Sequence, residues 1–313
     1  MKSIHATLAA ILLSIAAAAA CAAPVDETPP GNSRALARNM RLLGYHDLQG
    51  RGAFQAVIVQ QGERSIAYVG HAGGVALNPL TGKEEPNGTS ILDVTDPRHP
   101  KYLHHLPTES TAEVTGAEGG GAQMQQVCAG KDLPKGERGK FYMLRTNGSK
   151  AHEMWDVTAP ERPVKIATVA ENLKSTHRQT WECDTGIAYL NSGLPGWQVL
   201  RLTQVFDLSD PAHPVHIRDF ALPGQQPDAP KRANPRLYDG HGAWSTGVQG
   251  NRLYFGQGYV GSGGIQIVDR KKLLEGPKEP TAENLAYPQI AFRDVGTWQA
   301  VHAVYPLIGM EIA

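Results

Sequence analysis

Three histidines in the second half of the chain recur at a similar place relative to the segments around them. His177 and His241 each lie a short distance before an apolar segment that contains a tyrosine, and His302 opens a further segment of the same kind. Imidazole nitrogens bind Zn, Cu and Fe, and a site with three histidines keeps a coordination position open for water or substrate. If the fold brings these side chains together, the sequence predicts one transition-metal site.

The same histidines have a simpler interpretation, as polar side chains that line a water-filled channel. The chain has no His-x-His or His-Glu-x-x-His spacing, which would indicate a metal site more specifically. Gln55 and Gln123 are expected at the equivalent position of the preceding units, where they would be weak or indirect partners of a metal. Glu182 is expected to be a solvent-exposed charge, and no catalytic residue is assigned from the sequence.

The segments that carry the histidines belong to a repeat. An apolar run that leads into Asp-Val-Thr-Asp-Pro, or a close variant, contains Asp93, Asp156 and Asp207, and a degenerate copy contains Asp269. The copies recur at intervals of about 50 to 60 residues, and each interval accommodates four short strands, which is typical of β-propeller blades. Because every unit carries this aspartate, we expect it to stabilise a turn rather than to act in catalysis.

The turn sequences resemble those of the LVIVD-repeat family. Val94–Pro97 and Leu208–Pro211 match well, Val157–Pro160 lacks the second carboxylate, and Ile267–Asp269 retains only the strand. The resemblance covers roughly residues 52 to 313. It implies an exported β-propeller protein of undefined role, and it implies no ligand or substrate.

We therefore expect an all-β chain with a propeller domain. Residues 1–22 are expected to be a signal peptide, residues 23–50 a leader and linker, and residues 51–313 the β-propeller. The predicted four-stranded blades span approximately 51–115, 116–172, 173–232 and 233–295, and residues 296–313 begin a fifth. Because a propeller must close its ring, we expect an incomplete part of a seven-bladed ring. A closed ring of four or five blades is the alternative.

The N-terminus has the pattern of a secretory signal. A basic start at Lys2 is followed by an Ala-rich apolar stretch over residues 6–20 and by small residues up to Ala22. This stretch is too short for a stable membrane span, and Ala-x-Ala precedes the expected cleavage point. We expect export to the periplasm or the outside and no transmembrane span in the mature chain. Anchoring as a lipoprotein through Cys21 is the alternative.

Export makes the two remaining cysteines candidates for a disulfide. Cys128 and Cys183 fall in what we expect to be the first strands of adjacent units, at a similar depth. An oxidising compartment would allow them to form a bond. Two buried free thiols are the alternative, because the sequence does not give the distance between the two side chains.

The remaining features concern partners. Lys and Arg together number 30, as do Asp and Glu, so no net charge attracts the chain to nucleic acid, and we expect no such partner. Loops over residues 78–89, 131–139 and 225–237 are rich in polar residues, Gly and Pro, and are expected at the rims of the propeller. Trp197 lies in a Gly- and Pro-rich loop and is a candidate ligand contact.

These observations lead to two functional hypotheses. The first is an exported, LVIVD-like propeller that binds a protein or a small molecule, through its rim loops and the channel mouth. The second is a metal-dependent oxidoreductase or hydrolase whose Zn, Cu or Fe is held in the channel by His177, His241 and His302. The second hypothesis requires the three imidazoles to converge, whereas the first does not.

Overall fold

The computed structural model describes residues 39–109, 120–233, 238, 240–245, 250–258, 262–296 and 301–306. The predicted signal peptide, Cys21 and part of the predicted fifth unit therefore lie outside the described residues. Within the described residues the fold is all-β, as expected, and its strands form four four-stranded antiparallel sheets and one small hairpin.

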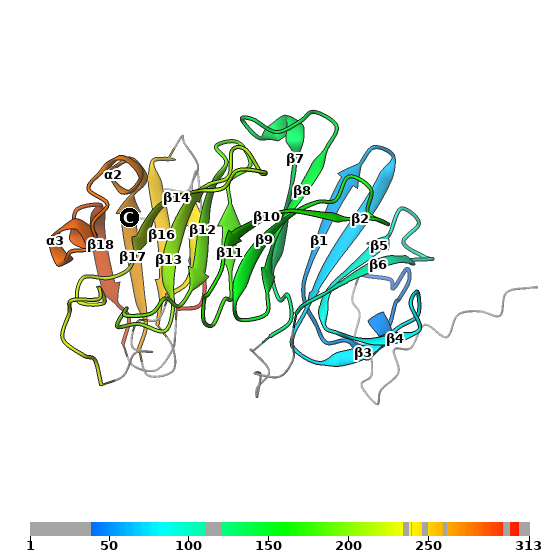
Figure 1. Ribbon diagram of the computed structural model, residues 1–313, viewed down its shortest axis with the longest axis horizontal. Coiled ribbons are helices and arrows are strands. Elements are labelled where there is room, and N and C mark those ends of the chain that lie inside the picture. Colours follow the sequence, from blue (N-terminus) through cyan, green and yellow to red (C-terminus); the bar gives the residue numbers. More distant parts are fainter. Residues whose placement is uncertain are drawn as a thin grey trace, which may run out of the picture.

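The four sheets, which we call blades 1 to 4, follow one another along the chain and stand side by side in that order (Figure 1). In each blade the strands pair in the order in which they occur, apart from the hairpin inserted in blade 1. Blade 1 contains β1 (Ala53–Gln61), β2 (Arg64–His71), β5 (Gly88–Asp93) and β6 (Lys101–Pro107), and blade 2 contains β7 (Gln125–Ala129), β8 (Phe141–Asn147), β9 (Ala151–Asp156) and β10 (Val164–Ala170). Blade 3 contains β11 (Gln179–Trp181), β12 (Ile187–Ser192), β13 (Leu202–Asp207) and β14 (Val215–Phe220), and blade 4 contains β15 (Gly240–Ser245), β16 (Arg252–Gln257), β17 (Gly264–Asp269) and β18 (Gln289–Asp294).

The first strands of the blades lie against one another. Strand β7 contacts both β1 and β11, and β11 contacts β15. The innermost strand of each blade therefore faces a common axis, which is the arrangement of a β-propeller. The expectation of a propeller with four-stranded blades is confirmed, while the number of blades in the ring stays a prediction.

The hydrophobic core lies between adjacent blades rather than within one sheet. Between blades 1 and 2, Tyr68 and Ile91 pack against Met143 of the next sheet, and all three side chains are fully buried. Equivalent clusters lie between blades 2 and 3, around Trp181, and between blades 3 and 4, around Phe255. Each blade is therefore stabilised mainly by its neighbours, as in other repeat folds.

The repeated aspartates stabilise turns, as the sequence indicated. The carboxylate of Asp93 accepts a hydrogen bond from the backbone N–H of Thr95 at 2.9 Å, and Asp156 and Asp207 accept equivalent bonds at 3.0 and 2.8 Å. In the degenerate fourth copy, Asp269 instead caps the helix α2 (Arg270–Glu275) by accepting from Lys272 N–H at 2.9 Å. The fourth turn is thus replaced by a short helix, which is followed by α3 (Ala282–Ala286).

Cys128 and Cys183 form the predicted disulfide. Cys128 belongs to β7 of blade 2, and Cys183 follows β11 of blade 3, with their Cα atoms 5.6 Å apart. The bond joins the inner strands of two neighbouring blades, next to the hydrophobic cluster between them. Disulfides of this kind are typical of oxidising compartments.

One predicted rim loop contains regular structure. Within residues 75–86, β3 (Val75–Asn78) and β4 (Lys83–Pro86) form a hairpin next to the 3-10 helix η1 (Leu48–Gly50). The guanidinium of Arg51 holds this hairpin by donating to the carbonyl oxygens of Ala76 and Glu85 at 2.7 and 3.1 Å. The expected loop over residues 131–139 begins as the 3-10 helix η2 (Gly130–Asp132), and the third loop is described only in part.

Candidate functional site

The first strands of blades 1 and 4 begin with a β-bulge. In β1, Phe54 is the extra residue between two residues that pair with β2, and it lies beside Gly70. In β15, His241 is the extra residue, beside Gly256 of β16. A bulge leaves the extra residue out of the regular pairing and redirects its side chain, and bulges of this kind are frequent next to functional sites.

Blade 3 has the same irregularity just before β11. The carbonyl oxygen of Asn191 accepts from the N–H of His177 at 3.1 Å, while the N–H of Asn191 donates to the carbonyl oxygen of Arg178 at 2.8 Å. Two residues thus lie opposite one, and His177 takes the position that Phe54 and His241 take in their blades. Its side chain is 1% exposed.

The equivalent residue of blade 2 is Gln123. The carbonyl oxygen of the following residue, Met124, accepts a hydrogen bond from the backbone N–H of Thr146 at 3.2 Å. Met124 therefore corresponds to Arg178 of blade 3, and Gln123 corresponds to His177. A Cβ atom on Gly70 would lie 2.4 Å from the carbonyl oxygen of Gln123, so the start of blade 2 crosses closely over the second strand of blade 1.

The segment 301–306 takes the same place relative to blade 4. A Cβ atom on Gly256 would lie 2.6 Å from the carbonyl oxygen of Val301 and 3.3 Å from the carbonyl carbon of His302. His302 therefore corresponds to Gln123. We call the five equivalent residues the axial residues: Phe54, Gln123, His177, His241 and His302.

The axial residues whose side chains the structure describes converge around His177. Its Nδ1 lies 3.0 Å from Oε1 of Gln123. The ring of His177 is 6.2 Å from that of His302 and 6.0 Å from that of Phe54, measured between centroids. The backbone of His241 lies in β15, but its side chain is outside the described part of the structure.

Two of the three predicted metal ligands are thus neighbours, and the metal site stays a prediction. Among the described side chains, no group of three or more His, Cys, Asp or Glu residues is placed to hold a metal ion. The ring nitrogens of His302 lie 3.1 and 3.0 Å from a guanidinium nitrogen of Arg178. A guanidinium only donates hydrogen bonds, so His302 accepts from Arg178 through the lone pair of a ring nitrogen. A metal ion bound to that ring nitrogen would be repelled by the positive charge of Arg178.

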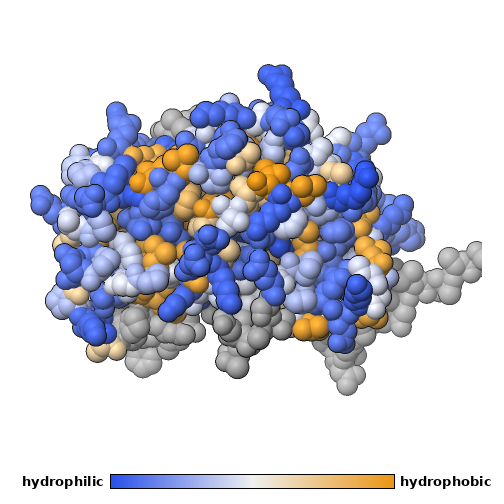
Figure 2. Space-filling model, in the orientation of Figure 1, coloured by the Kyte–Doolittle hydropathy of each residue, from blue (hydrophilic) through white to orange (hydrophobic). Residues whose placement is uncertain are grey.

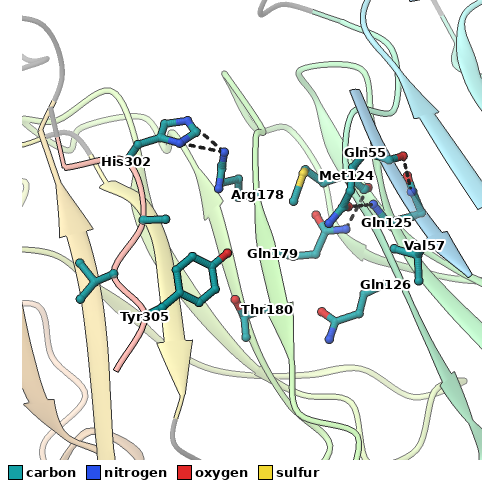
Figure 3. Close-up of a pocket in the computed structure, with 12 residues that line it drawn as sticks. Gln55, Val57, Met124, Gln125, Gln126, Arg178, Gln179, Thr180, His302 and Tyr305 are labelled. Atoms are coloured by element: carbon teal, nitrogen blue, oxygen red, sulfur yellow. Dashed lines mark hydrogen bonds between the residues drawn. The ribbon is translucent and has the colours of Figure 1, made fainter. Parts of the chain in front are cut away.

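One side of the axis is hollowed into a cavity of about 320 Å³ (Figure 3). Strands β1, β7 and β11 of three different blades and the segment 301–306 form its walls. The lining residues are largely amides and apolar groups, with one arginine: Gln55, Val57, Met124, Gln125, Gln126, Arg178, Gln179, Thr180, His302, Ala303, Val304 and Tyr305. Gln55 lines this cavity, but Phe54 takes the axial position expected for it, because the bulge in β1 shifts the register by one residue.

Two glutamines of the cavity wall brace neighbouring blades. Nε2 of Gln125 donates to the carbonyl oxygens of Gln55 and Tyr68 in blade 1, both at 2.9 Å. Nε2 of Gln179 donates in the same way to Met124 and Leu144 in blade 2, at 2.9 and 3.2 Å. These bonds fix the shape of the cavity and orient each amide.

Glu182 is not the solvent-exposed charge that the sequence suggested. Its side chain is 5% exposed and forms an ion pair with Arg270, whose Nε lies 3.2 Å from Oε1 of Glu182. Burial alone would lower the pKa of Arg270, but the hydrogen bond and the negative charge of Glu182 raise it. The pair joins blade 3 to the helix α2 of blade 4, so it is structural.

Trp197, the predicted ligand contact, packs against two hydrophobic clusters. It contacts the cluster around Tyr189 and the cluster that contains Leu202. It does not belong to the lining of the axial cavity described above. Its proposed contact with a ligand stays a prediction.

A second buried polar network lies in blade 1, away from the axis. Nε2 of His71 lies 2.8 Å from the hydroxyl of Ser90, which in turn lies 3.3 Å from Nδ1 of His105. Burial is the main cause that lowers the pKa of each histidine to about 4, and for His71 the nearby His105 and Arg51 act in the same direction. The partners of His71 come from other strands, so the sequence gives no signal of this network.

The face shown in Figure 2 has no single large hydrophobic area. Hydrophobic residues appear there as separate patches among hydrophilic side chains. Scattered apolar residues of this kind are normal on protein surfaces. None of the helices in the described part of the chain has the length and hydrophobicity of a membrane span.

Neither a protein-family model nor a curated protein matches this sequence. Among solved structures, the chain is similar to a predicted exo-beta-1,3-galactanase from Bifidobacterium bifidum s17, with 13% identity, a TM-score of 0.38, and coverage of 72% of this chain and 68% of that one. It is also similar to a predicted glycoside hydrolase from Parabacteroides distasonis ATCC 8503, with 11% identity, a TM-score of 0.34, and coverage of 80% and 74%. At these TM-scores the similarities carry no argument about function.

Proposed function

We propose that this chain is an exported, LVIVD-like β-propeller that binds a small molecule in the axial cavity. The observation that carries the proposal is the convergence of four separate segments on one hollow, with its shape fixed by hydrogen bonds between blades. Ligand sites are typically concave, largely preformed and lined by apolar groups with a few placed polar groups. The disulfide supports export, since such bonds persist in oxidising compartments.

The composition of the cavity favours binding over hydrolysis of glycosides. Most glycosidases use two carboxyl groups on either side of the scissile bond. The described lining residues include no Asp or Glu, and Glu182, which directly follows β11, forms an ion pair with Arg270. The described part of the cavity therefore lacks the groups for that mechanism.

The test is to extract bound small molecules from the natively exported, full-length protein and to identify them by mass spectrometry. Thr180→Trp would fill the cavity from β11, and Val57→Trp would fill it from β1. Thr168→Trp is the matched control, because Thr168 is exposed on the outer strand β10. We expect both cavity variants to lose the bound compound at an unchanged melting temperature, and the control to retain it.

If the wild-type protein carries no compound, or if both cavity variants keep it, the axial cavity is not the binding site. Attention would then move to the rim loops and Trp197. Export is tested separately by fusing residues 1–22 to a reporter enzyme that is active only after translocation. A fusion that stays inactive would contradict the proposed signal peptide.

The metal-dependent enzyme remains the second candidate, and the 6.2 Å between the rings of His177 and His302 favours it. Elemental analysis of the exported protein decides this point. One tightly bound transition metal that is lost from each of His177→Ala, His241→Ala and His302→Ala would support an enzyme. A wild-type protein without metal would rule out the three histidines as ligands.

A further inference from the structure

The buried histidine network of blade 1 is a continuous chain of contacts between two backbone carbonyl groups. Nε2 of His105 lies 2.9 Å from the carbonyl oxygen of Pro86, and Nδ1 of His71 lies 3.3 Å from the carbonyl oxygen of Gly52. Between the two rings, the hydroxyl of Ser90 lies 3.3 Å from Nδ1 of His105 and 2.8 Å from Nε2 of His71. All three side chains are buried, so their partners are protein groups.

The two carbonyl groups determine where the ring protons are. A carbonyl oxygen only accepts hydrogen bonds, so Nε2 of His105 and Nδ1 of His71 each carry a proton. A neutral imidazole has a single N–H, which leaves Nδ1 of His105 and Nε2 of His71 as acceptors. Both acceptors face the hydroxyl of Ser90, which has one proton to donate.

The neutral network is therefore one proton short. It contains four contacts, and each needs one proton to be a hydrogen bond, but two neutral imidazoles and one hydroxyl supply three. The contact at 2.8 Å indicates that Ser90 donates to His71. In the contact at 3.3 Å, the lone pair of Nδ1 of His105 then faces a lone pair of the hydroxyl oxygen. A buried acceptor without a donor lowers the stability of the fold.

The charged groups around the network act differently on its two rings. Burial is the main cause that lowers the pKa of both histidines, and the positive charge of Arg51 lowers it further in each. Arg145 acts in the same direction on His105, whereas the carboxylate of Glu85 raises the pKa of that ring. Of the two rings, His105 is therefore the better place for a positive charge.

Three of the neighbouring groups keep a fixed charge state in mild acid. Arg145 is paired with Glu153, whose Oε2 lies 3.0 Å from a guanidinium nitrogen. Burial raises the pKa of Tyr102, so its hydroxyl stays neutral. Burial alone would raise the pKa of Glu85, but hydrogen bonds from neighbouring side chains lower it, so Glu85 stays ionised. The two histidines are therefore the groups of this cluster that change charge as the pH falls.

From this geometry we propose that His71, Ser90 and His105 bind one proton as a unit, and that the proton resides on His105. His105 then donates to Pro86 and to Ser90, and Ser90 donates to His71, so all four contacts become hydrogen bonds. A second proton would charge His71, whose ring centroid is 6.1 Å from that of His105. It would also leave the hydroxyl proton of Ser90 without an acceptor in the network. Proton uptake therefore has two distinct steps.

The network links acidity to the attachment of the hairpin formed by β3 and β4. Pro86 ends β4, and Arg51, which precedes Gly52, donates to the same hairpin. The first proton strengthens the bond from His105 to Pro86, because a hydrogen bond from a charged donor is stronger than one from a neutral donor. The second proton adds repulsion between the two rings and Arg51. The hairpin should therefore stay attached through the first step and loosen in the second.

The experiment is an NMR titration of the full-length exported protein, with the histidine ring nitrogens labelled so that each reports its own proton. His71→Asn and His105→Asn assign the signals. We expect His105 to gain a second N–H in the first step while His71 keeps only its Nδ1 proton. The second step should need a proton concentration at least about tenfold higher.

His152 is a reference in the same titration. It is fully buried, neither of its ring nitrogens has a hydrogen-bond partner among the described groups, and burial lowers its pKa to about 3. The first step of the network should therefore occur at a higher pH than the protonation of His152, although burial keeps both below the ordinary pKa of histidine.

Ser90→Ala distinguishes the shared proton from simple repulsion between two charged rings. Repulsion does not depend on the hydroxyl, so repulsion alone would leave the first step unchanged. If the network binds the proton, the first step should need about tenfold more protons, as expected for the loss of a hydrogen bond to a charged group. Ser192→Ala is the matched control, because Ser192 is equally buried but its hydroxyl donates to Gln204 at 2.8 Å.

A first proton that resides on His71, or simultaneous protonation of both rings, would overturn the proposal. So would unfolding of the wild-type protein before His105 gains its second N–H. The wild-type titration decides these points even if Ser90→Ala does not fold. A folded Ser90→Ala variant whose first step is unchanged would also overturn the proposal.

Discussion

Gln125 and Gln179 make the same pair of hydrogen bonds one blade apart. Each side-chain amide donates to two backbone carbonyl oxygens of the blade before it, at distances between 2.9 and 3.2 Å. The repeat in the sequence is thus accompanied by a repeated contact between neighbouring blades. Blade 4 places Ala243 in the corresponding part of β15, so this contact is not used at every interface.

Replacing Gln125 is expected to weaken the interface between blades 1 and 2. In Gln125→Met the carbonyl oxygens of Gln55 and Tyr68 lose these donors while they remain inside the protein. We expect a loss of about 1 to 3 kcal/mol in the free energy of unfolding, measured by urea denaturation. Gln60→Met, at an exposed position of β1, is the control, and an equal effect of both changes would contradict the bracing role.

Removing the disulfide is expected to destabilise the contact between blades 2 and 3. The bond between Cys128 and Cys183 closes a loop with a sequence separation of 55 residues. Without this bond the unfolded chain has more conformational freedom. The double change Cys128→Ser and Cys183→Ser should therefore lower the free energy of unfolding by about 2 to 4 kcal/mol. A reducing agent should destabilise the wild-type protein by a similar amount and leave the double variant unchanged. A reductant effect on the variant as large as that on the wild type would contradict this account.

The close crossing between blades 1 and 2 predicts a specific requirement for glycine. A Cβ atom at Gly70 would lie 2.4 Å from the carbonyl oxygens of Ala122 and Gln123, which belong to the backbone and cannot move freely. Gly70→Ala is therefore expected to cost about 1 to 3 kcal/mol of stability through overpacking. A Cβ atom at Gly52 would meet nothing within 4 Å, so Gly52→Ala should change stability by less than about 0.5 kcal/mol. Equal melting temperatures for the two variants would show that the crossing can relax.

Acidification is expected to destabilise the fold below neutral pH. Burial lowers the pKa of His71 and His105 from 6.5 to about 4, so in the folded chain both stay neutral down to that pH. The unfolded chain takes up these protons at a higher pH, so the free energy of unfolding is fully retained above about 6.5 and falls between about 6.5 and 4. The loss is on the order of 3 kcal/mol per histidine.

Urea denaturation at a series of pH values measures this loss. His105→Asn should make the dependence between pH 6.5 and 4 less steep, because His71 still contributes, even if the variant is less stable overall. Gln60→Met, which changes an exposed residue that does not titrate, should leave the dependence unchanged. A wild-type stability that is constant over this range would contradict the buried, neutral state of His71 and His105.

Much of the fold could be predicted from the sequence, because its signals are local. The turns at Asp93, Asp156 and Asp207 depend on residues two positions away, and the alternation of short apolar runs with these turns indicates the strands. The similar position of Cys128 and Cys183 in adjacent units made their disulfide one of two alternatives, and the structure shows that the bond is formed. Repetition makes such local patterns reliable, since each copy confirms the others.

The candidate site could be predicted less well from the sequence than the fold. It depends on the register of each strand and on contacts between residues far apart in the chain. Phe54 rather than Gln55 reaches the axis because one bulge residue shifts the strand, and a shift of one residue exchanges the two faces of a strand. The partner of Glu182 is Arg270 of the next blade, and no sequence motif links these two residues. The cavity itself is formed by side chains from four segments, and no single stretch of the sequence identifies it.

The irregular start of the blades separates the identity of the axial residues from the pairing of the strands that follow them. Phe54, Gln123 and His177 differ in size, charge and chemistry, yet the strands that follow them pair in the same way. A position outside the hydrogen-bond ladder can change without disturbing it. The side chains at the axis can therefore differ from blade to blade while the framework of the sheets stays the same.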